Sequence, residues 1–297
     1  MIRFTKLHGC GNDYLYVDCF HQPVPPDPSE LARRMSNRHF GVGSDGLILV
    51  LPSDRADARM RMFNADGSEG TMCGNGLRAM AKFVFDHGLS RNNPLRVETL
   101  RGILSIDLHL DSFGKVASAT VDMDEPILES GRIPVQIDGI ASDQPVLDVP
   151  IGSTLACRPP APPGSLHQLG LERMSCLSMG SAHAVIFGPV ETVPLSEIGP
   201  WFEHHPAFPQ RVNVHFARAL SRDEVTMRTW ERGSGATLAC GTGACAVVVA
   251  GVLTGRLERN VRVHLPGGEL RIEWRQSDNH VYKTGPAVEV FSGEFPG

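Results

Sequence analysis

Two short stretches of the chain decide the fold: Met72-Cys73-Gly74-Asn75-Gly76-Leu77 and Ala239-Cys240-Gly241-Thr242-Gly243-Ala244. Each places a cysteine, a glycine, a polar residue and a second glycine directly before a run of apolar residues. Glycine leaves the backbone N–H groups open to a ligand, and the start of a helix carries a partial positive charge. The repeated pattern predicts two helices that each begin immediately after a cysteine.

The two predicted helices differ in their surroundings. After Gly76, apolar residues recur every three or four positions as far as Val84, and Gly88 is a suitable end for this helix. The run from Ala244 to Leu253 is apolar on nearly every side, which predicts a helix buried at the centre of its half of the protein.

Alternation of apolar and polar residues dominates the rest of the chain and predicts mostly β-sheet. The alternating segments are 1–6, 59–62, 104–110, 225–230, 261–265 and 270–275. The stretches upstream of the two cysteines also correspond, because His8-Gly9-Cys10-Gly11-Asn12 and Met179-Gly180-Ser181-Ala182-His183 each precede four mainly apolar residues. We infer two related halves.

Composition excludes several classes of protein. The 297 residues are 41% hydrophobic and 21% charged, which excludes disorder, collagen and coiled coil. The net charge of −5 and the pI near 6.2 predict no nucleic-acid partner. The longest apolar run, Ala244 to Leu253, is too short to cross a bilayer, so we expect no membrane partner.

The seven cysteines favour free thiols in a reducing compartment. Their number is odd and they form no C-x-x-C pair or zinc pattern. The first six residues alternate as a strand does and lack the apolar run of a signal peptide, and we expect a cytoplasmic protein. Outside the two motifs we expect the cysteines to be structural or exposed, with Cys245 in the core; they are Cys10, Cys19, Cys157, Cys176 and Cys245.

Two other segments are unusual in composition but predict no catalytic or metal-binding role. His204 and His205 precede a proline, and we interpret them as loop residues with no metal-binding role. The proline-rich segment 158–165 is predicted to be an extended surface excursion.

A pair of thiols at helix starts suits one kind of reaction. The helix start should lower the pKa of Cys73 and Cys240, so that one thiolate removes a proton from a carbon next to a carboxylate. The other thiol then delivers a proton to the opposite face, while backbone N–H groups hold the carboxylate. The four lysines do not lie in a phosphate-binding context, so we expect no pyridoxal phosphate, no other cofactor and no metal.

These motifs, with further stretches across the chain, closely resemble the diaminopimelate epimerase family. The further stretches are Phe63-Asn64-Ala65-Asp66-Gly67-Ser68-Glu69, Phe208-Pro209-Gln210-Arg211-Val212-Asn213, Trp230-Glu231-Arg232-Gly233 and Thr284-Gly285-Pro286-Ala287. The resemblance implies an α/β (α+β) fold of two pseudo-symmetric domains, each a mainly antiparallel sheet wrapped around a central helix, with the active site in the cleft between them. The last strand would return to the first domain, giving domains 1–121 plus 284–297 and 122–283.

The resemblance also implies an activity: cofactor-independent interconversion of LL- and meso-diaminopimelate, in lysine and peptidoglycan-precursor biosynthesis. Cys73 and Cys240 would alternate as acid and base. Gly74, Asn75, Gly241 and Thr242 would hold the reacting carboxylate. The rest of the substrate would be bound by Asn12, Asn64, Asn213, Glu231 and Arg232. His183 and Glu231 would tune the pKa of a cysteine. The expected partner is a small amino-acid substrate, and a homodimer is compatible with the sequence.

Two departures from the family pattern bear on the substrate. The family usually has Asn-Pro-His where this chain has Ser181-Ala182-His183, and some members have glutamine at Gly46. A racemase or epimerase for another α-amino acid is therefore the alternative. Proline-racemase-like enzymes resemble Met-Cys-Gly-His at the first motif, where this chain has Asn75. From another class, the cysteines could form a redox or metal pair in a binding protein.

Overall fold

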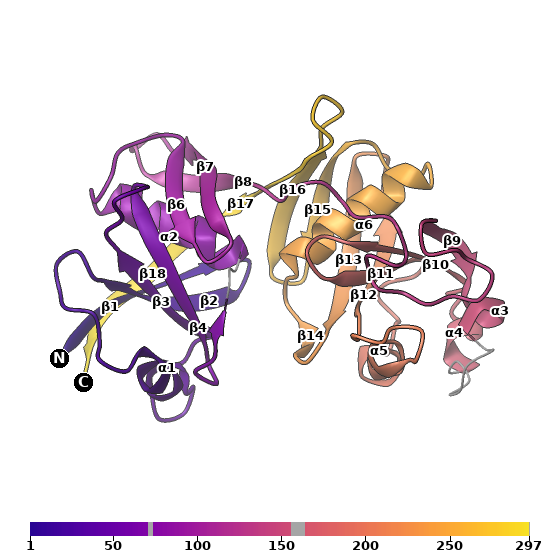
Figure 1. The fold of residues 1–297 in the computed structure, drawn as a ribbon, viewed down its shortest axis with the longest axis horizontal. Coiled ribbons are helices and arrows are strands. Elements are labelled where there is room, and N and C mark those ends of the chain that lie inside the picture. Colours follow the sequence, from indigo (N-terminus) through magenta and orange to yellow (C-terminus); the bar gives the residue numbers. More distant parts are fainter. Residues whose placement is uncertain (71–73, 156–163, 297) are drawn as a thin grey trace. The chain divides into compact units, whose positions relative to one another are not determined.

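The computed structural model describes residues 1–70, 74–155 and 164–296. They form 18 strands and six helices, a mixed α and β fold that is mostly sheet and confirms the predicted class. The chain divides into two compact units (Figure 1). Unit 1 is Met1–Asp122 with Thr284–Gly297, and unit 2 is Met123–Lys283.

Unit 1 is built from two segments of the chain, and most of its strands lie in the first segment, Met1–Asp122. Its elements are β1 (Ile2–Gly9), β2 (Asn12–Asp18), α1 (Pro28–Ser36), β3 (Gly46–Leu51), β4 (Ala58–Asn64), β5 (Glu69–Gly70), α2 (Gly74–Asp86), β6 (Leu95–Thr99), β7 (Gly102–Leu110), β8 (Val116–Asp122) and β18 (Val288–Phe295). The strand β17 (Val281–Pro286) carries the chain back from unit 2.

Unit 2 is continuous in sequence. Its elements are β9 (Val146–Pro150), α3 (Ile151–Leu155), α4 (Gly164–Gln168), β10 (Arg173–Ser178), β11 (Ala182–Phe187), α5 (Leu195–His204), β12 (Asn213–Ala219), β13 (Glu224–Glu231), β14 (Gly235–Thr237), α6 (Gly241–Leu253), β15 (Asn260–Leu265) and β16 (Gly268–Trp274).

The same order of strand pairings occurs in both units. In unit 1, β1–β2 is an antiparallel hairpin, β2–β3 is parallel, β3–β4 and β4–β5 are antiparallel, β4–β6 is parallel and β6–β7 is antiparallel. In unit 2, β10 to β16 repeat this series through β10–β11, β11–β12, β12–β13, β13–β14, β13–β15 and β15–β16. The two related halves inferred from the motifs are therefore present as one topology used twice.

Each unit has a helix packed inside its sheet at the corresponding place. The helix α2 contacts β1, β2 and β8, and α6 contacts β10, β11, β12 and β16 (Figure 1). In α6 every residue from Gly243 to Gly251 is buried, as its apolar sequence predicted. The two helices begin at the first glycine of their motifs, Gly74 and Gly241, and end before a glycine of positive φ, Gly88 at 76° and Gly255 at 72°.

The helix α2 is buried more completely than its single apolar stripe predicted, and two of its polar residues, Asn75 and Arg78, hydrogen-bond to each other. Arg78 has no exposed surface. Its Nη2 donates to Oδ1 of Asn75 at 2.9 Å, and its Nη1 donates to the carbonyl oxygen of Gly74 at 3.3 Å. A buried guanidinium is tolerated where hydrogen bonds replace water.

The prediction that His204 and His205 lie in a loop is wrong. His204 is the last residue of α5, and His205 is its buried C-terminal cap. The internal Pro200 hides this helix from sequence patterns. Burial decides the structure instead, because Trp230 packs where a side chain at Gly199 would stand, with its Cγ 2.3 Å from an ideal Cβ.

Four of the five cysteines outside the two motifs are described. Cys10, Cys176 and Cys245 are buried, and Cys19 is half-buried. Cys157 lies outside the described residues, as does most of the predicted excursion 158–165. Among the helices that the structure describes, none has the length and apolar character needed to cross a membrane.

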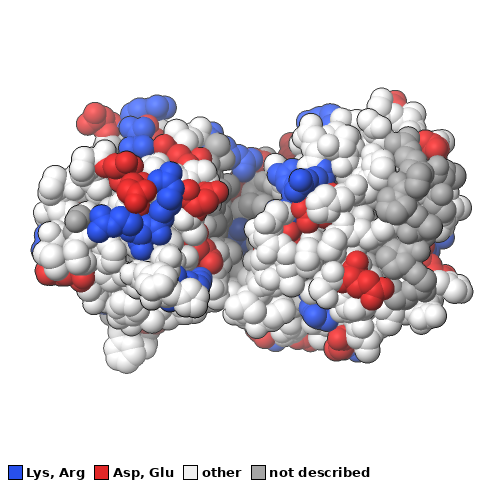
Figure 2. Space-filling model, turned by 90° about the horizontal axis from the view of Figure 1, so that it is seen from below, with Lys and Arg blue, Asp and Glu red and all other residues white. Residues whose placement is uncertain are grey.

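Charges of both signs lie side by side on the surface of unit 1. Figure 2 shows Lys or Arg next to Asp or Glu over the visible face of this unit. Ion pairs in the unit include Arg33 with Glu30 at 2.8 Å and Arg61 with Glu69 at 2.7 Å. Such exposed pairs contribute little to stability individually, and here they mix the two signs of charge.

The packing of α6 on the sheet generates a test. In Gly243→Ala the new methyl would lie 2.2 Å from Cε1 of the buried His215, so the ring or the helix must shift. We expect the free energy of unfolding in urea to fall by about 1–3 kcal/mol, the usual cost of overpacking a core. The matched control is Gly152→Ala in α3, which has open space around it. Equal stability of the two variants would contradict this account of the packing.

Candidate active site

The predicted site residues fall into one group in each unit. Cys73 lies outside the described residues, so the unit 1 group consists of Asn12, Asn64, Gly74 and Asn75. The unit 2 group comprises His183, Asn213, Glu231, Arg232, Cys240, Gly241 and Thr242.

In unit 1, the two asparagines lie at strand ends and have bonded side chains. Asn12 begins β2, and its Nδ2 donates to Oδ2 of Asp45 at 2.6 Å. Asn64 ends β4, and its Nδ2 donates to Oγ of Ser68 at 2.9 Å. In the sheet, Asn64 is the register partner of Gly46.

A charged network holds Asn12 in place. The carboxylate of Asp13 is 2.7 Å from Nζ of Lys6 and 2.7 Å from Nη2 of Arg38, and Arg38 also contacts Asp45 at 3.0 Å. Burial alone would raise the pKa of Asp13, but hydrogen bonds from Arg38 and Lys6 hold it below its ordinary value. Sequence reasoning missed these supporting residues because they are separated along the chain.

The start of α2 presents backbone groups. Asn75 is buried, with 8% of its surface exposed, and its Oδ1 accepts from Arg78. Its side chain is thus engaged inside the helix. The first N–H groups of a helix have no acceptor within the helix, so those at Gly74 and Asn75 suit an anion.

In unit 2, Cys240 is the N-cap of α6, with 4% of its surface exposed. Its Sγ lies 3.6 Å from Oγ1 of Thr242. Burial raises the pKa of this thiol, and the carboxylate of Glu231 raises it further, while hydrogen bonds from Thr242 and the Gly243 N–H oppose the shift. The predicted lowering of the Cys240 pKa is therefore wrong for this structure, since loss of water outweighs the helix start.

The segment that carries Glu231 and Arg232 is fastened on both sides. Oε1 of Glu231 accepts from Oγ1 of Thr237 at 2.6 Å. The backbone N–H of Arg232 donates to Oδ1 of Asn213 at 3.0 Å, and its Nη1 donates to the carbonyl oxygen of Gln210 at 2.8 Å. Asn213 and Arg232, far apart in sequence, are thus brought together.

Glu203 of α5 supports this segment and was missed. Its carboxylate accepts from Nε1 of Trp230 at 2.8 Å and from the N–H of Gly233 at 3.0 Å. It therefore fixes both sides of Glu231 and Arg232. No signal in the sequence could have revealed this residue, because α5 itself was not predicted.

His183 forms part of a buried pair of histidines. It is the register partner of Asn213 between β11 and β12, and its Nδ1 lies 2.8 Å from Nε2 of His215. Burial lowers the pKa of His183 to about 3, with the charge of Arg232 adding to the effect, and burial also lowers the pKa of His215. Both rings are neutral at pH 7. His215 was missed because its strand is buried on both faces and lacks alternation.

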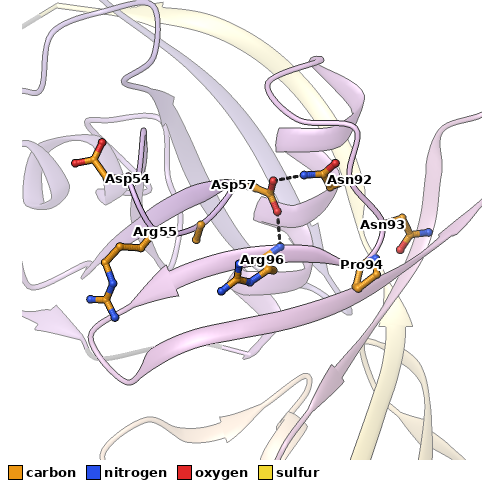
Figure 3. A pocket seen from close by; sticks show the side chains of 8 residues that line it. Asp54, Arg55, Asp57, Asn92, Asn93, Pro94 and Arg96 are labelled. Carbon is orange, nitrogen blue, oxygen red and sulfur yellow. Dashed lines mark hydrogen bonds between the residues drawn. The ribbon is translucent and has the colours of Figure 1, made fainter.

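A separate hollow in unit 1 lies between the loop after β3 and the start of β6 (Figure 3). The carboxylate of Asp57 joins its walls, accepting from Nδ2 of Asn92 at 2.6 Å and from the N–H of Arg96 at 2.7 Å. The described residues that line it are Asp54, Arg55, Ala56, Asp57, Asn92, Asn93, Pro94 and Arg96. None of these lining residues is a predicted site residue, and the hollow lies where two loops of unit 1 meet.

Comparison with known proteins gives the family. A sequence model of diaminopimelate epimerase matches residues 4–128 and 175–290. The chain is similar to the diaminopimelate epimerase of Acetivibrio thermocellus, with 51% identity over 297 residues that cover 99% of this chain and 98% of the relative. It is also similar to that of Moorella thermoacetica, with 50% identity over 299 residues and 99% of both chains covered.

Solved structures share the fold at low sequence identity. A phenazine biosynthesis protein of the PhzF family from Bacillus anthracis matches with a TM-score of 0.70 and 16% identity, covering 99% of both chains. A probable proline racemase from Agrobacterium radiobacter K84 matches with a TM-score of 0.65 and 14% identity, covering 100% of this chain and 93% of that one. These likenesses show that the fold is shared with those proteins.

The buried histidines predict a loss of stability in acid. An unfolded imidazole has a pKa of 6.5, and that of folded His183 is about 3, so the unfolded state binds more protons between these values. The free energy of unfolding should fall as the pH decreases from 7 to 5, by about 2 kcal/mol from His183. Urea denaturation should show a smaller fall in His183→Gln and an unchanged one in His39→Gln, an exposed control. The same fall in His183→Gln as in the parent protein would contradict this account.

The environment of Cys240 predicts its reactivity. In Glu231→Gln the negative charge next to the thiol is lost, so the pKa of Cys240 should fall. We expect faster alkylation of Cys240 by iodoacetamide at pH 8, measured by mass spectrometry of the peptide that contains it, because the thiolate is the nucleophile. Glu258→Gln, an exposed control in unit 2, should leave the rate unchanged. Slower alkylation in Glu231→Gln would be the opposite of the expected result.

Proposed function

Because this chain belongs to the diaminopimelate epimerase family, we propose that it interconverts LL- and meso-diaminopimelate without a cofactor. The observation that carries the proposal is about 50% identity over nearly the full length of relatives with that name. The product serves lysine and peptidoglycan-precursor biosynthesis. The Cys-Gly-polar-Gly motif at the start of α6 and its second copy at 72–77 supply the required chemistry.

In this reaction Cys73 and Cys240 act on opposite faces of the α-carbon. One thiolate removes the α-proton, and the electron pair left on carbon is delocalised into the carboxylate. Backbone N–H groups at Gly74, Asn75, Gly241 and Thr242 stabilise that charge. The other thiol donates its proton to the opposite face, which inverts the centre, and the two cysteines exchange roles in the reverse direction.

The raised pKa of Cys240 supports its assignment as the proton donor in the ligand-free enzyme. A thiol that keeps its proton near neutral pH is ready to deliver it. When Cys240 begins the reaction as the thiol, Cys73 is the thiolate that removes the α-proton. Glu231, which raises the pKa of Cys240, then tunes the thiol toward the acid role.

The remaining predicted residues bind the second amino-acid end of the substrate. Arg232 offers a planar guanidinium that suits a carboxylate. Asn12, Asn64, Asn213 and Glu231 offer amide and carboxylate groups for the ammonium and carboxylate. We propose a cytoplasmic location for the enzyme, where a reducing environment keeps the cysteine pair as thiols.

The test is proton exchange with inversion. The reduced protein is incubated with LL-diaminopimelate in D₂O, and loss of the α-proton signal is followed by NMR together with formation of the meso isomer. We expect both. Cys73→Ser and Cys240→Ser should each lower turnover by about 10²-fold or more, the usual contribution of a general acid or base. Cys19→Ser, a half-buried cysteine outside the motifs, is the control and should react at the parental rate.

The other outcomes discriminate between the alternatives. Exchange with a different α-amino acid but not with diaminopimelate would favour a related racemase whose substrate is selected at Ser181. Parental rates in both serine variants would contradict the two-base mechanism.

A further inference from the structure

A chain of four hydrogen-bonded side chains runs through the interior of unit 2. Oγ1 of Thr229 lies 2.9 Å from Nδ1 of His215, and Nε2 of His215 lies 2.8 Å from Nδ1 of His183. Nε2 of His183 lies 3.1 Å from Oγ of Ser181. Thr229 and both histidines are buried, whereas Ser181 is half-buried. The chain thus connects a residue of the core with one that is partly open to solvent.

The contact between the two imidazoles contains one hydrogen, which belongs to one of the two facing nitrogens. Both imidazoles are neutral at pH 7, because burial lowers their pKa values. Two facing nitrogens at 2.8 Å can form a hydrogen bond only when one carries a hydrogen and the other is bare. All the hydrogen bonds of the chain must therefore point the same way, either from Thr229 toward Ser181 or in reverse.

Thr229 selects the direction. Within the described part of the chain, its hydroxyl has one hydrogen-bond partner, Nδ1 of His215. In the reverse direction this buried hydroxyl would accept from His215, and its own hydrogen would be left without an acceptor, which is unfavourable. Thr229 therefore donates to Nδ1 of His215. Each histidine then carries its hydrogen on Nε2, so that His215 donates to His183 and His183 donates to Ser181.

The direction determines what Ser181 offers. Its oxygen accepts from Nε2 of His183 and, at 3.4 Å, from Nδ2 of Asn213. With both lone pairs engaged, the hydroxyl hydrogen points away from the chain toward the open side of Ser181. Asn213 also accepts from the backbone N–H of Arg232, and the positive charge of Arg232 is close enough to His183 to contribute to its lowered pKa.

We propose that Thr229 and His215 are positioning residues, which fix the hydroxyl of Ser181 as a hydrogen-bond donor for the substrate carboxylate that Arg232 binds. This inference rests on the proposed function and deepens it. The hydroxyl replaces the amide that the family usually has at this position. An amide has a fixed donor group, whereas a hydroxyl hydrogen can rotate, and the buried chain of hydrogen bonds fixes where it points. His215 is held against α6, since its ring occupies the space next to Gly243.

The direction of the chain is tested without activity. Nitrogen NMR of the histidine side chains in the ligand-free, full-length protein distinguishes protonated from bare ring nitrogens. We expect hydrogen on Nε2 and none on Nδ1 in both His183 and His215. Hydrogen on Nδ1 of either residue in the parent protein would overturn the proposal, whatever the substrate proves to be. In Thr229→Val the preference should be lost, and Thr229→Ser should restore it.

The effect on the substrate is tested by steady-state kinetics with diaminopimelate. Ser181→Ala should raise KM by about tenfold or more, with a smaller change in kcat, because a hydrogen bond to a charged group is lost. Thr229→Val should raise KM in the same sense, and Thr229→Ser should keep it near the parental value. Thr226→Val, on the same strand, is the matched control and should leave KM unchanged.

The double variant Ser181→Ala, Thr229→Val decides whether the two residues act through one chain. We expect its KM to equal that of Ser181→Ala, because Thr229 acts only through Ser181. Additive effects, or an unchanged KM in Ser181→Ala, would overturn the proposed contact. Absence of epimerase activity in the parent protein would contradict the proposed function, and the nitrogen NMR would still decide the direction of the chain.

Discussion

The contact between Gly243 and the imidazole of His215 is the constraint on which the site of unit 2 depends. Because position 243 has no side chain, the first turn of α6 lies directly against β12. Cys240, three residues earlier, is thereby held in a buried position at the helix start. The same contact immobilises His215, and through it His183. The absence of a side chain at position 243 thus allows both the burial of the Cys240 thiol and the close packing of His215 against α6.

The two units use the same topology but stabilise their sites in different ways. In unit 1, Asn12 is held by charges, with Asp45 and Arg38 in a network that reaches Asp13 and Lys6. In unit 2, the corresponding strands meet at neutral histidines. A charged network tolerates small displacements, since attraction between charges varies slowly with distance, whereas a chain of neutral hydrogen bonds demands strict alignment.

Local patterns were sufficient for the parts of the fold that repeat within a few residues. The glycines beside Cys73 and Cys240 and the apolar spacing after them predicted α2 and α6, and alternation predicted strands such as β7 and β16. Features that depend on distant partners were not predictable. The raised pKa of Cys240 arises from burial, and His215 matters because of its partners on two other strands, His183 on β11 and Thr229 on β13. Glu203 belongs to a helix that contains Pro200.

The pairing of β1 with β18 determines the order in which the protein takes shape during synthesis. Ile2 is the register partner of Phe295, so β1 keeps an unpaired edge until the ribosome has translated the chain as far as β18. Unit 2, which is continuous from Met123 to Lys283, is translated completely before that point. Unit 1 is consequently translated first but completes its sheet last. The unpaired edge of β1 is exposed to aggregation until β18 pairs with it.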